Sequence, residues 1–180
     1  MDIIEVVDGS PEWIGKFRAF AGLIRKALGP FALRIDHIGS TAIDGLAAKP
    51  VIDIQISVEA IAPAEGLIRM MAGIGCVWRP ENPHLTKLYF REPAGYERTH
   101  IHMRQHGGWH EQMALLFRDY LRTHPDERAP YTDLKRSLAV RFRENRAAYT
   151  DGKDQHIWGI IRRADHWALE TGWKPGVSDA

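Results

Sequence analysis

The chain has 180 residues, of which 44% are hydrophobic and 26% are charged, and its formal net charge is +1. This length and composition predict one soluble globular domain with a substantial core. The small net charge argues against nucleic acid as the partner and requires any electrostatic argument to be local. The single cysteine excludes an internal disulfide and fits a reducing compartment.

The N-terminal segment, MDIIEVVDGSPEW, has early acids and lacks a basic stretch followed by an apolar core, so we expect no signal peptide. No apolar run approaches the roughly 18 residues that a membrane-spanning helix needs. We therefore expect a cytoplasmic protein that makes no contact with a membrane.

The N-terminal third predicts one helix followed by two strands. DGSPEW is a helix-start signal, and apolar residues then recur at helical spacing until the Gly-Pro pair at 29–30. FALRIDHI predicts the first strand. KPVIDIQISV predicts the second strand, because its apolar residues alternate with Asp53, Gln55 and Ser57.

The rest of the chain completes an α+β pattern. A helix over 63–74 precedes two strands, 86–91 and 98–104, which the turn EPAGYE joins. Three C-terminal helices are predicted in HEQMALLFRDYLRTH, YTDLKRSLAVRFRENRAAY and KDQHIWGIIRRADHWALETG. We expect a single domain over 1–172, with a small mixed β-sheet flanked by helices, and a loose tail over 173–180.

Three of the predicted strands carry one apolar face and one polar face. A sheet with one solvated face gives this alternation, which is common in antiparallel sheets. The polar faces are uneven in sign, however, because bases outnumber acids, and solvated faces usually mix both. This composition favours a cleft for an anion. The polar side chains concerned are Asp53, Gln55, Ser57, Lys87, Tyr89, Arg91, Arg98, His100, His102 and Arg104.

Gly39-Ser40 and Asp53 form the first candidate site. The glycine lets the backbone approach a ligand, and the hydroxyl with nearby N–H groups can hold phosphate oxygens, although most Gly-Ser pairs are turns. Asp53 lies inside an apolar strand, where an unpaired carboxylate costs free energy to desolvate. Its candidate partners are Lys49, His102 and a divalent cation, and a plain salt bridge to Lys49 or Arg98 is the structural alternative.

His100-x-His102 places two imidazoles on one strand face, about 6.5–7 Å apart along the strand. That spacing suits a shared metal or two contacts to one phosphate. A zinc site would require a third protein ligand, for which Asp53 and His37 are candidates. Two hydrogen-bonded structural histidines are the alternative.

A basic stretch lies in the second predicted C-terminal helix. Its residues are Lys135, Arg136, Arg141, Arg143 and Arg146, and only Glu144 opposes them. These positions are spread around the helix, so we expect a solvated helix rather than a nucleic-acid-binding surface.

Five blocks of the sequence resemble the GrpB family of bacterial proteins. They are HIGSTAIDGLAAKPVIDI, RTHIHM, WHEQMALLFRDYLRTHP, YTDLKRSLA and YTDGKDQHI, and the resemblance runs from about residue 13 to residue 167. That family is placed in the nucleotidyltransferase-fold superfamily and is sometimes fused to dephospho-CoA kinase. The resemblance implies a small mixed sheet flanked by helices.

The signature that this resemblance implies is a Gly-Ser pair before a short helix, two carboxylates separated by one residue on the next strand, and a third carboxylate on a later strand. Gly39, Ser40 and Asp53 match it, whereas Gln55 occupies the second carboxylate position. One of the histidines of RTHIHM stands where the third acid is expected. Two-metal transfer needs several anionic oxygens, and imidazoles shift the preference of a site from Mg²⁺ toward Mn²⁺ or Zn²⁺.

The sequence and the resemblance predict a protein that binds a phosphorylated, nucleotide-like ligand and, as an enzyme, transfers a nucleotidyl or phosphoryl group to a small acceptor. Phosphate contacts are expected from His37, Gly39, Ser40, Lys49, Lys87, Arg98 and Arg104. The candidate catalytic residues are Asp53, His100 and His102, with Asp53 and His102 as ligands of Mg²⁺ or Mn²⁺. The alternatives are a non-catalytic binding module, which Gln55 favours, and a metal hydrolase built on His-x-His.

Overall fold

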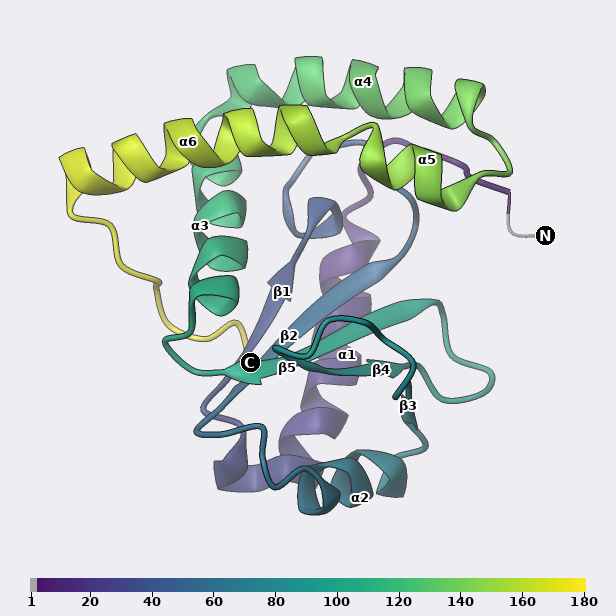
Figure 1. Ribbon diagram of the computed structural model, residues 1–180, viewed down its shortest axis with the longest axis vertical. Coiled ribbons are helices and arrows are strands. Elements are labelled where there is room, and N and C mark those ends of the chain that lie inside the picture. The colour runs from purple at the N-terminus through teal and green to yellow at the C-terminus, as the bar shows by residue number, and fades with distance from the viewer. Residues whose placement is uncertain (1–2) are drawn as a thin grey trace.

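The computed structural model describes residues 3–180 and combines one mixed β-sheet with helices (Figure 1). The helices are α1 (Glu12–Leu28), α2 (Glu65–Gly73), α3 (Trp109–Thr123), α4 (Arg128–Arg141), α5 (Arg146–Asp151) and α6 (Asp154–Thr171). The strands are β1 (Arg34–Ile38), β2 (Ile52–Val58), β3 (Val77–Trp78), β4 (Leu88–Arg91) and β5 (Thr99–Gln105). Short 3₁₀ helices are η1 (Gly29–Phe31), η2 (Ser40–Ala42) and η3 (Pro125–Glu127). The α+β class that the sequence predicts is confirmed.

The strand order β1-β2-β5-β4-β3 brings residues distant in sequence together. β2 pairs antiparallel with β1 and parallel with β5, which makes the sheet mixed. In the parallel pair, Asp53 lies opposite His100, and Gln55 lies opposite His102. Residues paired across neighbouring strands point to the same face of a sheet. The register therefore gathers the carboxylate, the amide and both imidazoles on one face.

The opposite face of the sheet is apolar and lies against α1 and α2. Phe17 and Ile24 of α1 join Ile54 of β2 and Ile101 of β5 in one buried cluster. Figure 1 shows α1 behind the sheet, with α2 at the bottom of the molecule and α4, α5 and α6 across the top. The part of the polar face that carries Asp53 and His100 faces a cavity lined by the C-terminal helices, whereas Gln55 and Ser57 are buried.

Two details of the helices and strands differ from the prediction. The second of the three predicted C-terminal helices is broken after α4, and Asn145 caps the start of α5 by accepting a hydrogen bond from the Ala148 N–H at 3.0 Å. The part of the chain that the structure describes thus has four α-helices after β5. β3 was not predicted, because two residues are too short to show an alternation.

The tail beyond α6 lies along the free edge of β1, where the sequence predicted a loose segment. The Ile35 N–H donates to Ser178 Oγ at 2.8 Å, and the His37 N–H donates to Asp179 Oδ2 at 2.9 Å. Asp179 also pairs with the buried Arg118 at 2.9 Å. These contacts hold the tail in place. Across residues 3–180, no helix combines the length and the apolar character needed to cross a membrane.

Candidate functional site

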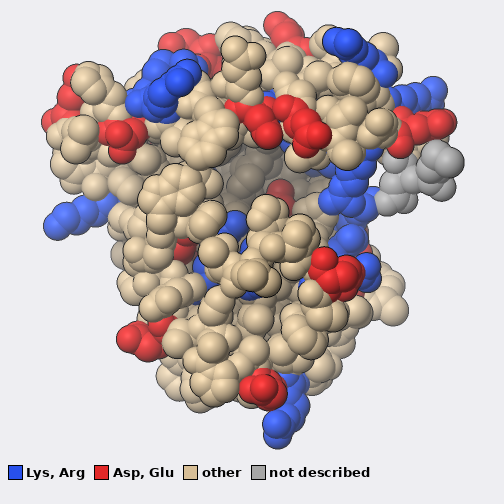
Figure 2. Space-filling view, in the orientation of Figure 1, with Lys and Arg blue, Asp and Glu red and all other residues tan. Residues whose placement is uncertain are grey.

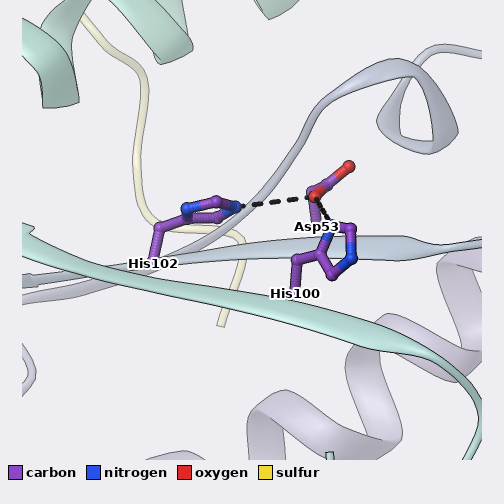
Figure 3. A group of neighbouring side chains, drawn as sticks. All are labelled: Asp53, His100 and His102. Atoms are coloured by element: carbon purple, nitrogen blue, oxygen red, sulfur yellow. Dashed lines mark hydrogen bonds and ion pairs between the residues drawn. The ribbon is translucent and has the colours of Figure 1, made fainter. Parts of the chain in front are cut away.

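Asp53, His100 and His102 converge on the polar face of the sheet (Figure 3). His100 Nδ1 lies 3.1 Å from Asp53 Oδ1, and His102 Nε2 lies 3.5 Å from the same oxygen. The Asp53 side chain is 29% exposed, and the imidazoles are 13% and 15% exposed. The three groups are therefore largely shielded while the carboxylate still reaches an opening.

The ionisation states in this cluster follow from burial and mutual contacts. Burial by itself would raise the pKa of Asp53, but the contacts from the two histidines outweigh it and hold that pKa below its usual value. Burial lowers the pKa of His102 to about 4, so its imidazole is neutral near pH 7. Lys87 Nζ lies 3.0 Å from His102 Nδ1, and we assign the ring proton to Nε2, facing Asp53.

Gly39 is required by the closeness of Asp53. Its backbone has a φ of +70° and a ψ of −171°, a conformation that is essentially restricted to glycine. A Cβ atom at this position would lie 2.6 Å from Asp53 Oδ2. Ser40 follows at the start of η2. At the Gly-Ser pair, the backbone thus comes close to the Asp53 carboxylate, which an ordinary turn would not require.

A cavity of about 230 Å³ lies next to Asp53, between the sheet and the C-terminal helices. Figure 2 shows this face of the molecule hollowed beneath those helices. Among the described residues that line the cavity, four are lysines or arginines and one is an acid. The lining residues are Ser40, Thr41, Ala48, Lys49, Val51, Asp53, His100, Tyr131, Lys135, Arg146, Tyr149, Thr150 and Lys153. The cavity therefore suits a compact polyanion.

Lys135 is the cation that enters the cavity from α4, and it is 2% exposed. Its ammonium group donates to Ser40 Oγ at 3.2 Å and to the Ala47 carbonyl, and it lies 4.3 Å from the centre of the Tyr131 ring. Burial lowers its pKa to about 7. The prediction of a solvated basic helix is therefore wrong at this position.

Lys49 and Lys153 meet at the ring of Tyr149. Their Nζ atoms lie 5.1 Å and 4.8 Å from the ring centre, within the range of cation–π attraction. Burial, followed by the positive charge of Lys153, lowers the pKa of Lys49 to about 8. Burial also lowers the pKa of Lys153. Both lysines are thus held at positions where their charge is costly, as is usual at a ligand site.

Gln55 is fully buried, and both ends of its amide are bonded. Its oxygen accepts from Arg104 Nη1, and its nitrogen donates to the Glu111 carbonyl at 3.2 Å. The Glu111 carboxylate accepts in turn from Ser57 Oγ at 2.6 Å. Gln55 therefore belongs to a bonded network and offers no free oxygen to a second cation.

The structure places the remaining predicted phosphate ligands outside the lining of the cavity beside Asp53. His37 is buried on the apolar side, where its ring stacks on Phe17 at 4.8 Å and its Nε2 lies 3.0 Å from Thr41 Oγ1. Burial lowers its pKa to about 4. Lys87 and Arg104 contact His102 and Gln55 rather than lining the cavity, and Arg98 lines a neighbouring cavity.

Sequence reasoning did not assign the cavity residues of the C-terminal helices to the site. These residues are Tyr131, Lys135, Arg146, Tyr149, Thr150 and Lys153. One signal was available for α4, because its buried residues, Tyr131, Lys135, Leu138 and Ala139, follow the helical period of a packed face. A lysine within such a face needs a buried partner.

Asp53, His100 and His102 could hold one divalent cation. Each offers one ligand atom, and the three atoms lie within 4.8 Å of one another. One carboxylate and two imidazoles fit a single cation such as Mn²⁺ or Zn²⁺ better than they fit Mg²⁺. The bonded amide of Gln55 does not fit a second cation. A cation at His102 Nε2 would displace the proton that we assign there, so its binding would release a proton.

Comparisons with known proteins agree with the fold. The sequence matches the family described as GrpB protein over residues 3–163. A UPF0157 protein of Pseudomonas aeruginosa is 40% identical over 166 residues, which cover 91% of this chain and 68% of that protein. A dephospho-CoA kinase of Mycolicibacterium paratuberculosis is 35% identical and is matched over 96% of this chain but 48% of its own length. The chain thus spans about half the length of that kinase.

Two kinds of solved structure are similar. The conserved protein GrpB from Enterococcus faecalis superposes with a TM-score of 0.82 at 31% identity, over 94% of this chain and all of that one. The poly(U) polymerase Cid1 superposes with a TM-score of 0.53 at 12% identity, over 76% of this chain and 45% of that one. The second likeness concerns the fold alone. The chain therefore belongs to the GrpB family and has a nucleotidyltransferase-like fold.

Proposed function

We propose that this protein binds the phosphates of a nucleotide-like ligand in the cavity beside Asp53. The observation that carries the proposal is the imbalance of charge in the lining, where Lys49, Lys135, Arg146 and Lys153 face the carboxylate of Asp53 among the described residues. Depressed lysine pKa values indicate cations that lack sufficient compensation. Several phosphate oxygens would supply that compensation through charge-assisted hydrogen bonds.

The reaction class that we propose is transfer of a nucleotidyl or phosphoryl group to a small acceptor. Gly39, Ser40 and Asp53 match the signature that the sequence resemblance implies, and the fold is nucleotidyltransferase-like. The lysines would neutralise the phosphates, and the Asp53 cluster would hold one cation, which supplies further charge neutralisation when bound.

Gln55 favours a second candidate, a binding module without transfer chemistry. Its amide is engaged by Arg104 and by the Glu111 carbonyl, so the two-cation arrangement is unsupported here. Both candidates require the same anion cavity. They are separated by incubating the protein with nucleoside triphosphates and Mn²⁺ and measuring whether pyrophosphate or phosphate is released.

Lys153→Gln should weaken pyrophosphate binding about tenfold or more, because one charge-assisted hydrogen bond contributes roughly 1.5–3 kcal/mol. Lys26→Gln is the matched control, since Lys26 is exposed on α1 and away from the cavity. Titration calorimetry with pyrophosphate measures both variants. Equal affinity in the wild type and in Lys153→Gln, or no pyrophosphate binding by the wild type, would refute the proposal.

Anion binding should weaken as the pH rises from 6.5 to 9. Burial lowers the pKa of Lys135 to about 7 and, together with Lys153, lowers that of Lys49 to about 8, so the ligand-free cavity loses positive charge in this window. A bound anion favours the protonated lysines and is therefore bound together with protons. Sulfate is a suitable probe because its own charge is constant over this range. A sulfate affinity that stays flat or increases would contradict this expectation.

Asp53→Asn should weaken Mn²⁺ binding by about 100-fold or more. The substitution removes the anionic member of the Asp53, His100 and His102 group, and changes to residues outside the ligand shell already reduce metal affinity about 10–100-fold. Asp133→Asn removes an exposed carboxylate of α4 and is the control. Calorimetric titration with Mn²⁺ measures the change. Indistinguishable affinities for the two variants would exclude Asp53 as a ligand.

Gln55→Asp should leave the number of bound cations at one. The new carboxylate would pair with Arg104, whose guanidinium now contacts the Gln55 oxygen, and the hydrogen bond from the Gln55 amide to the Glu111 carbonyl would be lost. A typical intramolecular hydrogen bond contributes roughly 0.5–1.5 kcal/mol, so the variant should also be less stable. Native mass spectrometry with Mn²⁺ and urea unfolding test both expectations. Two bound Mn²⁺ ions in the single variant would show that Arg104 does not block the second position.

A further inference from the structure

A second cavity, of about 220 Å³, adjoins the phosphate cavity. The two cavities share Lys49, Val51, His100 and Arg146 as lining residues. The second cavity extends from these residues toward the N-terminal segment, whose Ile3, Ile4 and Glu5 contribute to its wall together with Pro50 and Arg98. A ligand group in one cavity would therefore lie directly beside a group in the other.

The second cavity combines apolar walls with positive charge. Ile3, Ile4, Pro50 and Val51 supply the apolar surface, and Lys49, Arg98 and Arg146 supply the cations. Among the described residues of its lining, Glu5 is the one carboxylate. Phosphates alone would gain nothing from the apolar part of this wall. A group that has both an apolar body and an anionic end matches both kinds of surface.

The wall formed by the N-terminal segment is fixed in position. The Ile4 N–H donates to the Arg143 carbonyl at 2.8 Å, and Val7 forms a two-way β-bridge with Ala48 at 2.9 Å. Ile4 itself is 6% exposed and packs in a cluster with Tyr149 of the phosphate cavity. A preformed wall costs little ordering entropy when a ligand binds, which is typical of binding sites for small molecules.

The cations of the two cavities also influence one another. After burial and the charge of Lys153, the charges of Arg146 and Arg98 contribute to the lowered pKa of Lys49. Arg146 lines both cavities, and Arg98 lines the second. An anion in the first cavity offsets part of this repulsion, and the second cavity, which Lys49, Arg98 and Arg146 line, remains beside it. This arrangement fits two anionic groups bound side by side.

We infer that the second cavity is the subsite of the acceptor, and that the acceptor carries its own anionic group on an apolar body. The inference rests on the proposed function, because the phosphates of the first ligand define the neighbouring subsite. Arg98 and Arg146 would hold the anionic group of the acceptor, and Ile3, Pro50 and Val51 would contact its apolar part. The acceptor is thereby placed next to the phosphates.

The experiment uses two probes in sequence. The wild type is saturated with pyrophosphate and then titrated with phenylphosphonate, which has an apolar ring and one anionic group. Arg98→Gln should weaken phenylphosphonate binding about tenfold while changing pyrophosphate affinity less than twofold. Glu5→Gln removes the acid of the same cavity and should strengthen phenylphosphonate binding two- to fivefold. Arg69→Gln, an exposed position on α2, should change neither.

The opposite signs expected for Arg98→Gln and Glu5→Gln cannot arise from a general loss of folding. Competition between phenylphosphonate and pyrophosphate would overturn the second subsite and leave the proposed function intact. Failure of phenylphosphonate to bind the saturated protein would have the same meaning. Failure of pyrophosphate itself to bind would instead overturn the proposed function, and the acceptor subsite with it.

Discussion

Lys135→Met should weaken pyrophosphate binding about tenfold to 100-fold and, at pH 6, raise the stability of the ligand-free protein. Lys135 is 2% exposed, and its ammonium group donates to Ser40 Oγ and to the Ala47 carbonyl at the wall of the phosphate cavity. Removing it deletes a charge-assisted contact worth roughly 1.5–3 kcal/mol to a bound anion. Methionine has a similar length and keeps the apolar contacts of α4.

The gain in stability follows from the direction of the pKa shift. Burial lowers the pKa of Lys135 from 10.5 to about 7. At pH values below the folded-state pKa, this difference corresponds to a loss of roughly 4–5 kcal/mol of folding stability. The lost hydrogen bonds offset part of this, which leaves an expected gain of roughly 1–3 kcal/mol. Between pH 7 and 10.5 the unfolded chain binds more protons at this site, so wild-type stability should rise with pH and the variant should show a flatter profile.

Urea unfolding at several pH values, combined with pyrophosphate titration, tests both parts of this prediction. Lys26→Met, on the exposed side of α1, is the control and should alter neither affinity nor the pH profile. A Lys135→Met variant that binds pyrophosphate like the wild type would remove Lys135 from the site. A variant that is less stable at pH 6 would show that the two hydrogen bonds outweigh the burial of charge.

Gly39→Ala should destabilise the protein by roughly 2–4 kcal/mol and remove cation binding. The backbone at this position has a φ of +70° and a ψ of −171°, and a side chain forced into such a region costs on the order of 1–3 kcal/mol. The added Cβ would also lie 2.6 Å from Asp53 Oδ2 and 3.1 Å from Asp53 Cβ. The carboxylate would have to move away from the two histidines.

Gly22→Ala provides the matched control, since a Cβ there meets nothing within 4 Å and the residue lies within α1. That variant should be up to about 1 kcal/mol more stable, because alanine is the better helix former. Unfolding midpoints in urea and Mn²⁺ titrations compare the two variants. A Gly39→Ala protein with wild-type stability and cation affinity would show that Asp53 has room to move.

Local patterns predicted the polar face but not how its members are paired. The alternation in β2 and β5 identified Asp53, His100 and His102, because side chains of a strand point to opposite faces in turn. The parallel register that places Asp53 opposite His100 depends on tertiary packing and left no local signal. The antiparallel register of β1 and β2 pairs His37 with Ile54 on the face that packs on Phe17, which explains why His37 does not reach the cavity.

The positive wall of the cavity was beyond sequence reasoning for a different reason. Lys135 of α4, Arg146 of α5 and Lys153 in the turn before α6 lie far along the chain from Asp53, and their alignment is set by how the C-terminal helices pack on the sheet. Gln55 was identified as a departure from the superfamily signature. Only the structure shows that Arg104 and Glu111 engage the amide that stands in place of the acid.

The segment beyond α6 has a consequence for the free edge of the sheet. Ser178 and Asp179 accept hydrogen bonds from the N–H groups of Ile35 and His37, and the Ala180 N–H donates to the Ile35 carbonyl at 3.1 Å. These residues satisfy the main-chain groups of β1 much as a neighbouring strand would. A chain shortened to residue 172 would expose that edge and offer it to strand pairing between molecules, the usual route to aggregation.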